Sequence, residues 1–316
     1  MKKILILGHN GLVGSALVTA FKSDSSYRTI AGLDRQRTNL RNAIQVDRKF
    51  QKLRPDYVVL AAAKVGGIQA NQSLPVEFLQ WNMEIITSVF SAAQNSGVEK
   101  FIFLGSSCIY PRDSEQPIKE SALLTSALEK TNEAYALAKI CGVKLCEYYA
   151  REYQKDFRAV MPTNLYGLND TYSDSSSHVI PNLIRKFHLA KLHNHETVEV
   201  WGTGKPKREF LYSSDLAFAV KSVLEIEREA FSELCPDRLI NIGSGHEISI
   251  ADLSQQIAEI VGFNGHIEFN TDRPDGTPRK LLDSSRVKSI GWVPRTQLRE
   301  GITNAYKDYL ISTTNP

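Results

Sequence analysis

The sequence predicts an α/β fold, namely a Rossmann-type doubly wound parallel sheet with a smaller, mixed α/β domain beside it. Short, fully apolar runs of strand length alternate with longer segments of helical periodicity, which indicates a parallel sheet covered by helices on both faces. A glycine-rich turn separates the first apolar run from the first helix. The 316 residues suffice for one large α/β unit or for two domains.

The individual elements follow from the same patterns along the chain. We expect strands at residues 3–7, 28–33, 57–62, 101–104 and around 159–161. We expect helices at 11–21, 76–96, 132–153 and 213–224. The composition becomes richer in Ser, His and Asn after residue 167. We therefore expect a dinucleotide-binding domain over 1–165, with a returning segment near 213–240, and a discontinuous substrate-binding domain over 166–316.

Composition and charge argue against several classes of protein. The net charge of +3 gives no reason to expect nucleic acid or an anionic membrane as a partner. No apolar run could span a bilayer, and the run at 4–7 is too short for a signal peptide. The four cysteines form no CxxC and no disulfide framework, so we expect reduced thiols and a cytoplasmic protein; they are Cys108, Cys141, Cys146 and Cys235.

Other potentially reactive side chains have simpler interpretations. Cys141 and Cys146 fall within the helix expected at 132–153, and we interpret both as packing residues. His193 and His195 lie two residues apart, but no further ligands for a metal can be identified. We therefore expect no metal.

The segment "GHNGLVG" is the first motif that carries chemistry. Gly8, Gly11 and Gly14 follow a strand and open a helix. Gly8 would allow a tight turn, Gly11 would let the backbone approach a pyrophosphate, and Gly14 would let the helix pack on the strand. The exposed N–H groups at the helix start favour the anion. An ordinary glycine turn is the alternative, but the strand–turn–helix context favours a dinucleotide.

The second strand ends in conflicting signals about which dinucleotide binds. Asp34 lies 34 − 14 = 20 residues beyond Gly14, the spacing typical of an acid that binds the ribose 2′-hydroxyl of NAD. Arg35 and Arg37 beside it suit the 2′-phosphate of NADP. Arg37 taken alone fits a solvated surface charge at least as well. On balance we expect NADP.

Tyr135 and Lys139 suggest proton transfer. A spacing of four residues places them on one face of a helix, where the ammonium would lower the pKa of the phenol toward neutrality. This pair alone is common in long helices. It gains meaning from Ser106, which follows the strand at 101–104, because ligands of open α/β sheets bind outside the carboxyl ends of the strands. The three residues would fix a carbonyl, protonate it, and hold the nicotinamide ribose.

At these residues the chain resembles the extended short-chain dehydrogenase/reductase superfamily, and the resemblance covers essentially the whole chain. The segments that carry it are "GHNGLVGSAL", "LAAAKVGGIQAN", "LGSSCIYP", "NEAYALAKICGVKLCE", "MPTNLYG", "SSSHVIPNLIRKFH", "VWGTGKPKREFLY" and "PDGTPRKLLD". In detail they are similar to members that convert GDP-4-keto-6-deoxy-D-mannose to GDP-L-fucose. That activity combines 3,5-epimerisation with NADPH-dependent reduction of the 4-ketone.

The resemblance also implies roles for individual residues. The catalytic set is Ser106, Cys108, Tyr135, Lys139 and His178, with Cys108 as the base of epimerisation and His178 as the acid. The cofactor-binding set is Gly8, Asn10, Gly11, Leu12, Val13, Gly14, Arg35, Ala62, Lys139, Asn164, Leu165 and His178. The substrate-binding set is Lys186, Trp201, Arg208 and Lys280. Asn10 departs from the basic residue that the family often has there, so recognition of a 2′-phosphate would depend more on Arg35.

Simpler interpretations remain open for several of these residues. Without the resemblance, Cys108 is more typical of a buried small side chain and His178 of a surface residue. Trp201 could belong to a core, and Lys186 to a solvated helix face.

Two other functions are also possible. A related nucleotide-sugar 4-epimerase or 4,6-dehydratase is one, but a dehydratase would carry an Asp-Glu pair after a Thr where this chain has Ser106-Ser107-Cys108. A non-enzymatic NADP-binding module is the other, but such proteins typically lose the tyrosine or the lysine. The two long helices at 76–96 and 132–153 could form a four-helix bundle in a homodimer.

Overall fold

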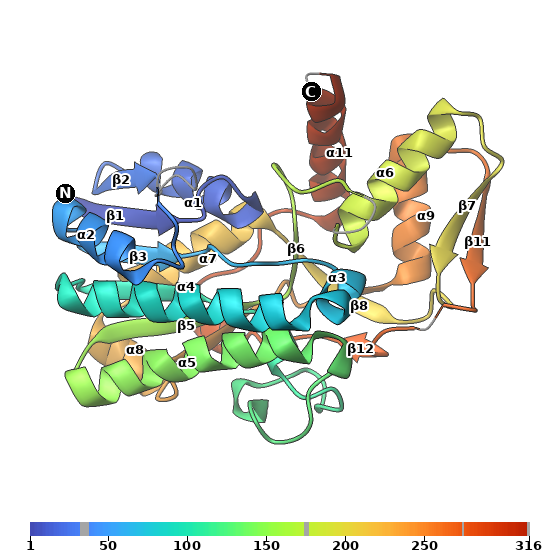
Figure 1. The fold of residues 1–316 in the computed structure, drawn as a ribbon. Coiled ribbons are helices and arrows are strands. Elements are labelled where there is room, and N and C mark those ends of the chain that lie inside the picture. The colour runs from blue at the N-terminus through green and yellow to red at the C-terminus, as the bar shows by residue number, and fades with distance from the viewer. Residues whose placement is uncertain (32–37, 174–176, 274, 315–316) are drawn as a thin grey trace.

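A six-stranded parallel sheet forms the larger part of the molecule (Figure 1). The computed structural model describes residues 1–31, 38–173, 177–273 and 275–314. The strand order is β2-β1-β3-β4-β5-β9, and every neighbouring pair is parallel. The strands are β1 (Lys2–Leu7), β2 (Tyr27–Ala31), β3 (Tyr57–Leu60), β4 (Lys100–Leu104), β5 (Asp156–Pro162) and β9 (Leu239–Ile242). The order reverses between β1 and β3, which is where a doubly wound sheet binds its ligand.

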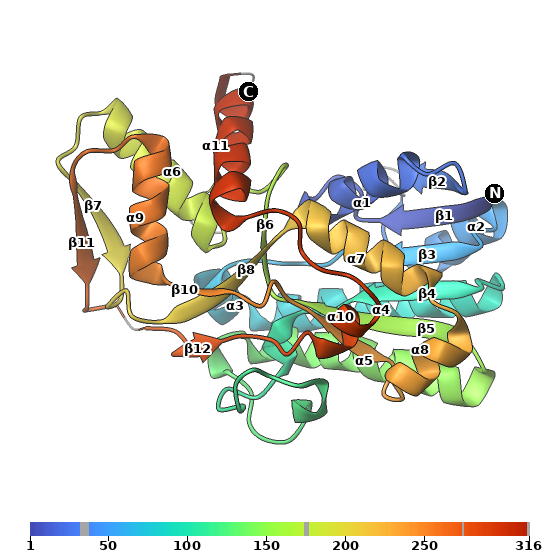
Figure 2. The ribbon, with the colours of Figure 1, turned by 180° about the vertical axis from the view of Figure 1, so that it is seen from behind.

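Helices cover both faces of this sheet (Figures 1 and 2). One face carries α2 (Ala43–Leu53), α4 (Pro75–Asn95) and α5 (Glu133–Tyr153), and the other carries α1 (Leu12–Lys22) and α7 (Ser213–Glu225). Successive strand residues point to opposite faces and are buried on both; Phe101 packs under α4 and α5, whereas Ile102 packs under α1 and α7. This two-sided burial is why the strands read as continuous apolar runs. The short helices α8 (Arg228–Leu234) and α10 (Ser285–Ser289) lie near β9.

Most of the chain beyond β5, apart from α7, α8, β9 and α10, builds a smaller unit with its own core. One sheet contains β6 (Asn164–Tyr166), β8 (Lys207–Tyr212), β10 (Glu247–Ser249) and β12 (Arg279–Lys280), and a two-stranded sheet contains β7 (Thr197–Trp201) and β11 (His266–Asn270). Helices α6 (Val179–Leu192), α9 (Ile250–Val261) and α11 (Leu298–Thr314) enclose this core. A short helix, α3 (Ile68–Ser73), and three single turns, η1 (Ser107–Ile109), η2 (Glu120–Ala122) and η3 (Lys130–Asn132), lie in the connections.

The expected fold class is confirmed, and the element bounds differ by a few residues. β3 ends two residues earlier than expected, whereas β5 is longer at both ends. β2 ends at Ala31, and the rest of the strand expected at 28–33 lies outside the described residues. α2 and the small sheets were not expected. Their segments are short or mostly polar, so that no strong apolar periodicity marks them.

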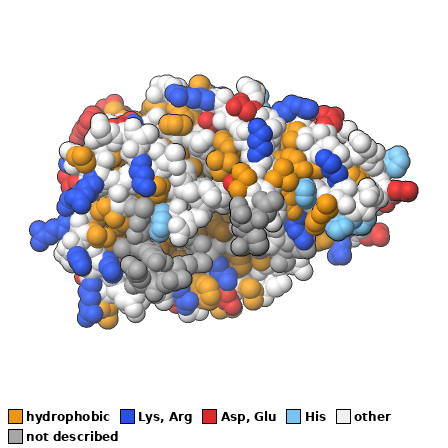
Figure 3. Space-filling view, turned by 90° about the horizontal axis from the view of Figure 1, so that it is seen from above, with side chains coloured by type: hydrophobic (Ala, Val, Ile, Leu, Met, Phe, Trp, Pro, Cys, Tyr) orange, Lys and Arg blue, Asp and Glu red, His pale blue; other side chains and the backbone are white. Residues whose placement is uncertain are grey.

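The space between the two units opens to the surface. Seen from above, the molecule is hollowed between the six-stranded sheet and the smaller unit, and basic and acidic side chains are scattered over this face (Figure 3). Within the described ranges, no helix combines the length and apolarity that a membrane crossing requires.

Candidate active site

The glycine turn after β1 has the geometry of a phosphate cradle. Gly8 has φ +92°, and a Cβ there would come within 2.7 Å of the Ala62 nitrogen at the end of β3. A Cβ on Gly14 would overlap the carbonyl oxygen of Gly8, so the first turn of α1 packs directly on the loop. Gly11 is different, because its Cβ would meet only the Gly8 oxygen, at 3.6 Å, and its outer side is exposed. The turn therefore leaves room at Gly11 for a pyrophosphate to approach the N-terminus of α1.

Other residues of the expected cofactor set surround this turn. Asn10 is exposed, and Leu12 and Val13 begin α1. Asn164 and Leu165 lie on β6, where the Asn164 amide donates a 2.8 Å hydrogen bond to the Glu209 carbonyl. Arg35 lies outside the described residues, as do Asp34 and Arg37. The expectation of NADP over NAD therefore stays a prediction at those positions.

A tight turn at the end of β4 sets the position of Ser106 and Cys108. The Gly105 amide donates to the Val160 carbonyl at 2.9 Å, and a Cβ on Gly105 would overlap the Met161 side chain. Ser106 then caps η1, and Cys108 lies within that single turn. The sheet edge thus places a hydroxyl and a thiol two residues apart, and the thiol is 6% exposed.

Tyr135 and Lys139 approach this turn from α5. The Lys139 ammonium donates a 2.7 Å hydrogen bond to the carbonyl of Leu104, the last residue of β4. Tyr135 lies one turn earlier on the same helix face, and its phenol lies beside the Ser106 hydroxyl, which affects its pKa. The Ser106 hydroxyl also lies beside the Cys108 thiol and affects its pKa. The structure therefore brings together four of the five expected catalytic residues.

Burial dominates the electrostatics of this cluster. It raises the pKa of Tyr135 far above its ordinary value, and only the nearby Ser106 hydroxyl opposes the shift. The expectation that the Lys139 ammonium lowers the pKa of the phenol is thus wrong, because desolvation of the buried phenol dominates. Burial likewise lowers the pKa of Lys139 to about 8. It raises the pKa of Cys108, against the attraction of Lys280 and Lys139.

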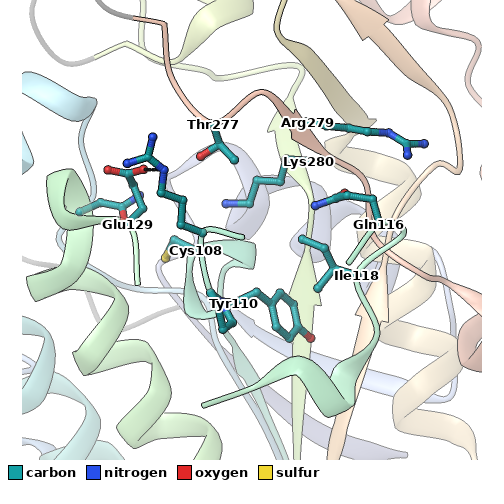
Figure 4. A pocket seen from close by; sticks show the side chains of 11 residues that line it. Cys108, Tyr110, Gln116, Ile118, Glu129, Thr277, Arg279 and Lys280 are labelled. Carbon is teal, nitrogen blue, oxygen red and sulfur yellow. Dashed lines mark ion pairs between the residues drawn. The ribbon is translucent and has the colours of Figure 1, made fainter. Parts of the chain in front are cut away.

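A small pocket opens beside Cys108 (Figure 4). Its volume is about 40 Å³. Lys280 projects from β12 into this pocket, on the side where Cys108 lies. The side chain of Glu129 lies across it, paired with Arg112 at 3.5 Å. Its remaining lining residues are Tyr110, Pro111, Gln116, Ile118, Asn132, Thr277 and Arg279.

A buried carboxylate that the sequence did not reveal positions Lys280. Glu209 accepts hydrogen bonds from the Gly245 amide at 2.7 Å and the Leu282 amide at 3.1 Å. It thereby fixes the chain after β12 beside β8, where Lys280 pairs in register with Arg208. Burial raises the pKa of Glu209. Nothing in the residue spacing of "KREFLY" separates this buried acid from an ordinary polar strand residue.

Lys186, Trp201 and an unexpected arginine form a second cluster on the smaller unit. The Trp201 ring is 53% exposed and lies between the Lys186 ammonium, 5.7 Å from its centroid, and the Arg273 guanidinium, at 4.9 Å. The interpretation of Trp201 as a core residue is therefore wrong. Lys186 is not fully solvated either, since burial lowers its pKa and its ammonium donates to the Glu199 carbonyl. Arg273 was missed because 72 residues separate it from Trp201 in the chain.

The remaining expected residues occupy separate positions. His178 precedes the first turn of α6 and is exposed, although partial desolvation by the surrounding chain lowers its pKa. Within the described parts of the chain, no contact joins His178 to Cys108, so its role as the acid stays a prediction. All four cysteines are free. Cys146 belongs to the core, but Cys141 is exposed, and the interpretation of Cys141 as a packing residue is wrong.

Comparisons with known proteins agree with this geometry. The family model described as "NAD dependent epimerase/dehydratase family" matches residues 4–243. The chain is 46% identical to the GDP-L-fucose synthase of Sinorhizobium fredii, over 99% of this chain and 97% of that protein. Among solved structures, a GDP-6-OMe-4-keto-L-xylo-heptose reductase from C. jejuni is 33% identical, with a TM-score of 0.92 and 98% coverage of both chains. A GDP-L-fucose synthetase from Naegleria fowleri bound to NADP is 27% identical, with a TM-score of 0.88, covering 99% of this chain and 95% of that one.

The site contains a glycine turn, a Ser106–Tyr135–Lys139 cluster and an adjacent thiol. These features agree with the matched family model and with the GDP-L-fucose synthase that is 46% identical over 99% of this chain. The chain belongs to the NAD dependent epimerase/dehydratase family, in the branch that contains the GDP-L-fucose synthases.

Proposed function

We propose that this chain converts GDP-4-keto-6-deoxy-D-mannose to GDP-L-fucose by 3,5-epimerisation followed by NADPH-dependent reduction of the 4-ketone. The observation that carries the proposal is the cluster at the end of β4. There the Ser106 hydroxyl lies beside both the Tyr135 phenol and the Cys108 thiol, close enough to affect the pKa of each. A reductase of this fold needs the hydroxyl pair, whereas a thiol beside it adds a base for removing protons next to the same ketone.

Epimerisation follows from what this cluster can do to a ketone. The hydrogens on C3 and C5 become acidic when the enolate oxygen that develops is stabilised by hydrogen bonds. Ser106 and Tyr135 would donate those bonds, because Tyr135 keeps its proton through the raised pKa of its phenol. Cys108 would remove the proton from one face of the carbon. His178, at the start of α6, would return a proton to the other face.

Reduction uses the same hydroxyl pair. The nicotinamide of NADPH supplies the hydride when the cofactor is bound. Tyr135 would give its proton to the carbonyl oxygen as negative charge develops there, and Ser106 would hold that oxygen in place. Lys139 would bind the nicotinamide ribose through its ammonium. Ser106 and Tyr135 would thus bind the ketone oxygen in all three steps, namely epimerisation at C3, epimerisation at C5 and reduction.

NADP is the proposed cofactor. The glycine turn fits a dinucleotide, since only glycines fit at positions 8 and 14 and the space beside Gly11 is open. The Naegleria fowleri relative is a complex with NADP, which supports NADP here. Arg35 would bind the 2′-phosphate, because Asn10 carries no charge with which to do so.

The GDP part of the substrate would lie across the smaller unit. Trp201 offers an exposed flat ring to the guanine or a sugar, and Lys186 and Arg208 offer cations to the diphosphate. Arg208 and Lys280 lie in register on neighbouring strands, and Lys280 also lines the pocket beside Cys108. Lys280 would therefore meet the sugar end of the substrate.

We propose a homodimer in the cytosol as the working form. Helices α4 and α5 pack side by side on the outer face of the sheet and expose Leu79, Leu137 and Tyr148. The same helices of a second copy would cover these side chains around a two-fold axis. Leu137→Glu would then convert a dimer to a monomer in sedimentation velocity. Four free cysteines support a reducing compartment.

The experiment that tests the activity is a product analysis. The purified protein is incubated with GDP-4-keto-6-deoxy-D-mannose and NADPH, and the nucleotide sugars are separated and identified by NMR. We expect GDP-L-fucose from the wild type. In Tyr135→Phe the rate of reduction should fall by a factor on the order of 10² or more. Tyr110→Phe is the matched control, because its hydroxyl binds Asn241 rather than the cluster. Formation of a 4-reduced sugar with unchanged C3 and C5 would contradict the proposal.

A further inference from the structure

The proposed function creates a proton problem that the structure addresses. Two carbons, C3 and C5, must each lose a proton to one thiol. A thiol that has taken the first proton cannot act on the second carbon until it has released that proton. Cys108 is 6% exposed, so bulk water has little direct access to the sulfur. The site therefore needs a group that carries protons between the sulfur and solvent.

Lys280 has the right position for this. Its side chain enters the pocket that Cys108 also lines (Figure 4). Within the described ranges, its ammonium makes no hydrogen bond or ion pair, in contrast to the neighbouring Arg279, which binds Glu247 at 2.6 Å. Lys280 is half-buried, and a partly desolvated cation without a partner is costly. Among the charged groups that attract Lys280, Cys108 as a thiolate has the largest effect.

Three other charged groups lie near Cys108 or Lys280, and two of them already have partners. Lys139 donates to the Leu104 carbonyl and faces Tyr135. Arg208 lies beside Lys280 and repels it, which favours loss of a proton from Lys280. Glu129 attracts Lys280 from across the pocket but is paired with Arg112. Among the described residues that line this pocket, Cys108 and Lys280 therefore form a pair that can exchange a proton.

The pocket also provides a route to solvent. Its volume of about 40 Å³ admits a water molecule, since one water needs roughly 10–15 Å³ of such space. Asn132 lines the pocket, and its side-chain oxygen is buried without a hydrogen-bond partner among the described residues, so it could hold such a water. Arg112 also lines the pocket, and its side chain is 55% exposed. Water can thus connect the Lys280 ammonium to the surface.

We propose that Lys280 is the proton partner of Cys108: its ammonium favours the thiolate form of the sulfur, and its release and uptake of protons restores that thiolate after each epimerisation step. Abstraction moves a proton from carbon to sulfur, and the electron pair of the C–H bond enters the enolate. Lys280 then gives one proton to pocket water, and its neutral amine takes the proton from sulfur. The net change is one proton from carbon to solvent, with thiolate and ammonium regenerated. The role rests on the proposed function.

The first test measures the thiol without any substrate. The rate at which iodoacetamide modifies Cys108 is followed against pH by peptide mass spectrometry, with the exposed Cys141 as an internal reference. We expect the Lys280→Met profile to shift upward by about one pH unit or more, because an opposite charge nearby typically lowers a pKa by about 1–3 units. Arg279→Met, on the same pocket wall, should leave the profile unchanged. Equal profiles for wild type and Lys280→Met, or no modification of Cys108 up to pH 10, would overturn the proposal.

The second test separates proton transfer from charge. Lys280→Arg keeps a cation but cannot release its proton at these pH values. It should retain the wild-type modification profile and yet give, in D₂O with the keto sugar, a larger share of product deuterated at one carbon than the wild type. If Lys280→Arg gave the same ratio of singly to doubly deuterated sugar as the wild type, proton transfer by Lys280 would be contradicted. A shifted Lys280→Met profile without deuterium uptake in any form would uphold the thiol–lysine pair and refute the proposed function, whereas uptake with an unshifted profile would refute the pair alone.

Discussion

The ammonium of Lys139 donates a 2.7 Å hydrogen bond to the carbonyl oxygen of Leu104. Leu104 ends β4, and Lys139 lies inside α5, so this single bond ties the helix to the carboxyl edge of the sheet. Tyr135 lies one turn before Lys139 and reaches Ser106, two residues beyond Leu104. The bond thus sets the distance between Tyr135, the proposed acid, and the Ser106 hydroxyl, which would bind the same ketone oxygen.

Lys139 makes the rate of reduction depend on pH in a defined direction. Burial lowers the pKa of Lys139 to about 8, so its ammonium is present below that pH and is lost as the pH rises through it. We expect kcat/KM for NADPH, which reports groups of the free enzyme, to fall above pH 8. Lys139→Met should lose on the order of 10²-fold in this constant at pH 7. Lys139→Arg should remove the decline, because a guanidinium stays charged. A wild-type profile that stays flat to pH 9.5 would contradict this.

The glycine turn makes separable predictions for folding and cofactor binding. A methyl group on Gly11 meets only one atom, at 3.6 Å, so Gly11→Ala should unfold within about 1 kcal/mol of wild type. The same methyl fills the approach to α1 and should weaken NADPH binding by about tenfold or more. Gly14→Ala is the contrasting variant, because its methyl overlaps the Gly8 carbonyl and should cost about 1–3 kcal/mol of stability.

Chemical denaturation and fluorescence titration with NADPH would measure the two effects. Wild-type affinity in a folded Gly11→Ala protein would show that the pyrophosphate binds elsewhere.

Trp201 should matter for substrate binding and little for stability. Its ring is 53% exposed between two cations, so Trp201→Ala removes little buried surface. We expect KM for the GDP sugar to rise by about tenfold or more, with kcat changed much less. Trp81→Ala is a matched control, since the Trp81 ring also lies against two cations, Arg41 and Lys64, but belongs to α4 of the larger unit. Steady-state kinetics that show equal KM values in the two variants would exclude Trp201 from the substrate site.

Asp170 should make the folded protein less stable as the pH rises toward neutral. Burial raises the pKa of its carboxyl to about 7, and one of its oxygens has no hydrogen-bond partner among the described residues. The unfolded chain ionises this group near pH 4, whereas the folded protein keeps it protonated up to about pH 7. Stability is therefore full below pH 4, falls between about pH 4 and 7, and stays reduced above.

Asp170→Asn should remove this decline and stabilise the protein at pH 8 by a part of the roughly 4 kcal/mol that three pKa units represent. Urea unfolding at pH 5 and pH 8 measures the difference, and Asp272→Asn at an exposed position is the control. An equal effect of both variants at pH 8 would refute the assignment to Asp170. The charge of Asp308 also raises the pKa of Asp170. Its contribution would account for a smaller stabilisation by Asp170→Asn.

Local sequence patterns predicted the scaffold of the site well. The apolar runs of β1, β3, β4 and β5 come from strands buried on both faces, and the helical periodicity of α4 and α5 comes from one buried side. The roles of Gly8 and Gly14 could be predicted because backbone contacts within the turn allow no side chain. Tyr135 and Lys139 share a face because four residues are about one helical turn.

Properties that depend on tertiary packing could not be read from the sequence. The stacking of Arg273 on Trp201 and the placement of Lys280 beside Cys108 join segments far apart in the chain. The direction of the Tyr135 pKa shift depends on how much protein surrounds the phenol, which residue spacing does not show. Cys141 and Cys146 differ in burial although they lie on one helix, because only the second faces the sheet.

The most direct test of the account is hydrogen exchange without reduction. The protein is incubated with GDP-4-keto-6-deoxy-D-mannose in D₂O without cofactor, and deuterium at C3 and C5 is followed by mass spectrometry in wild type and Cys108→Ser. We predict uptake at both carbons in the wild type, a collapse of that uptake in Cys108→Ser, and reduction to GDP-L-fucose once NADPH is added to the wild type. Absence of uptake in a wild-type protein that still reduces the ketone would contradict the account and leave a reductase without epimerase activity.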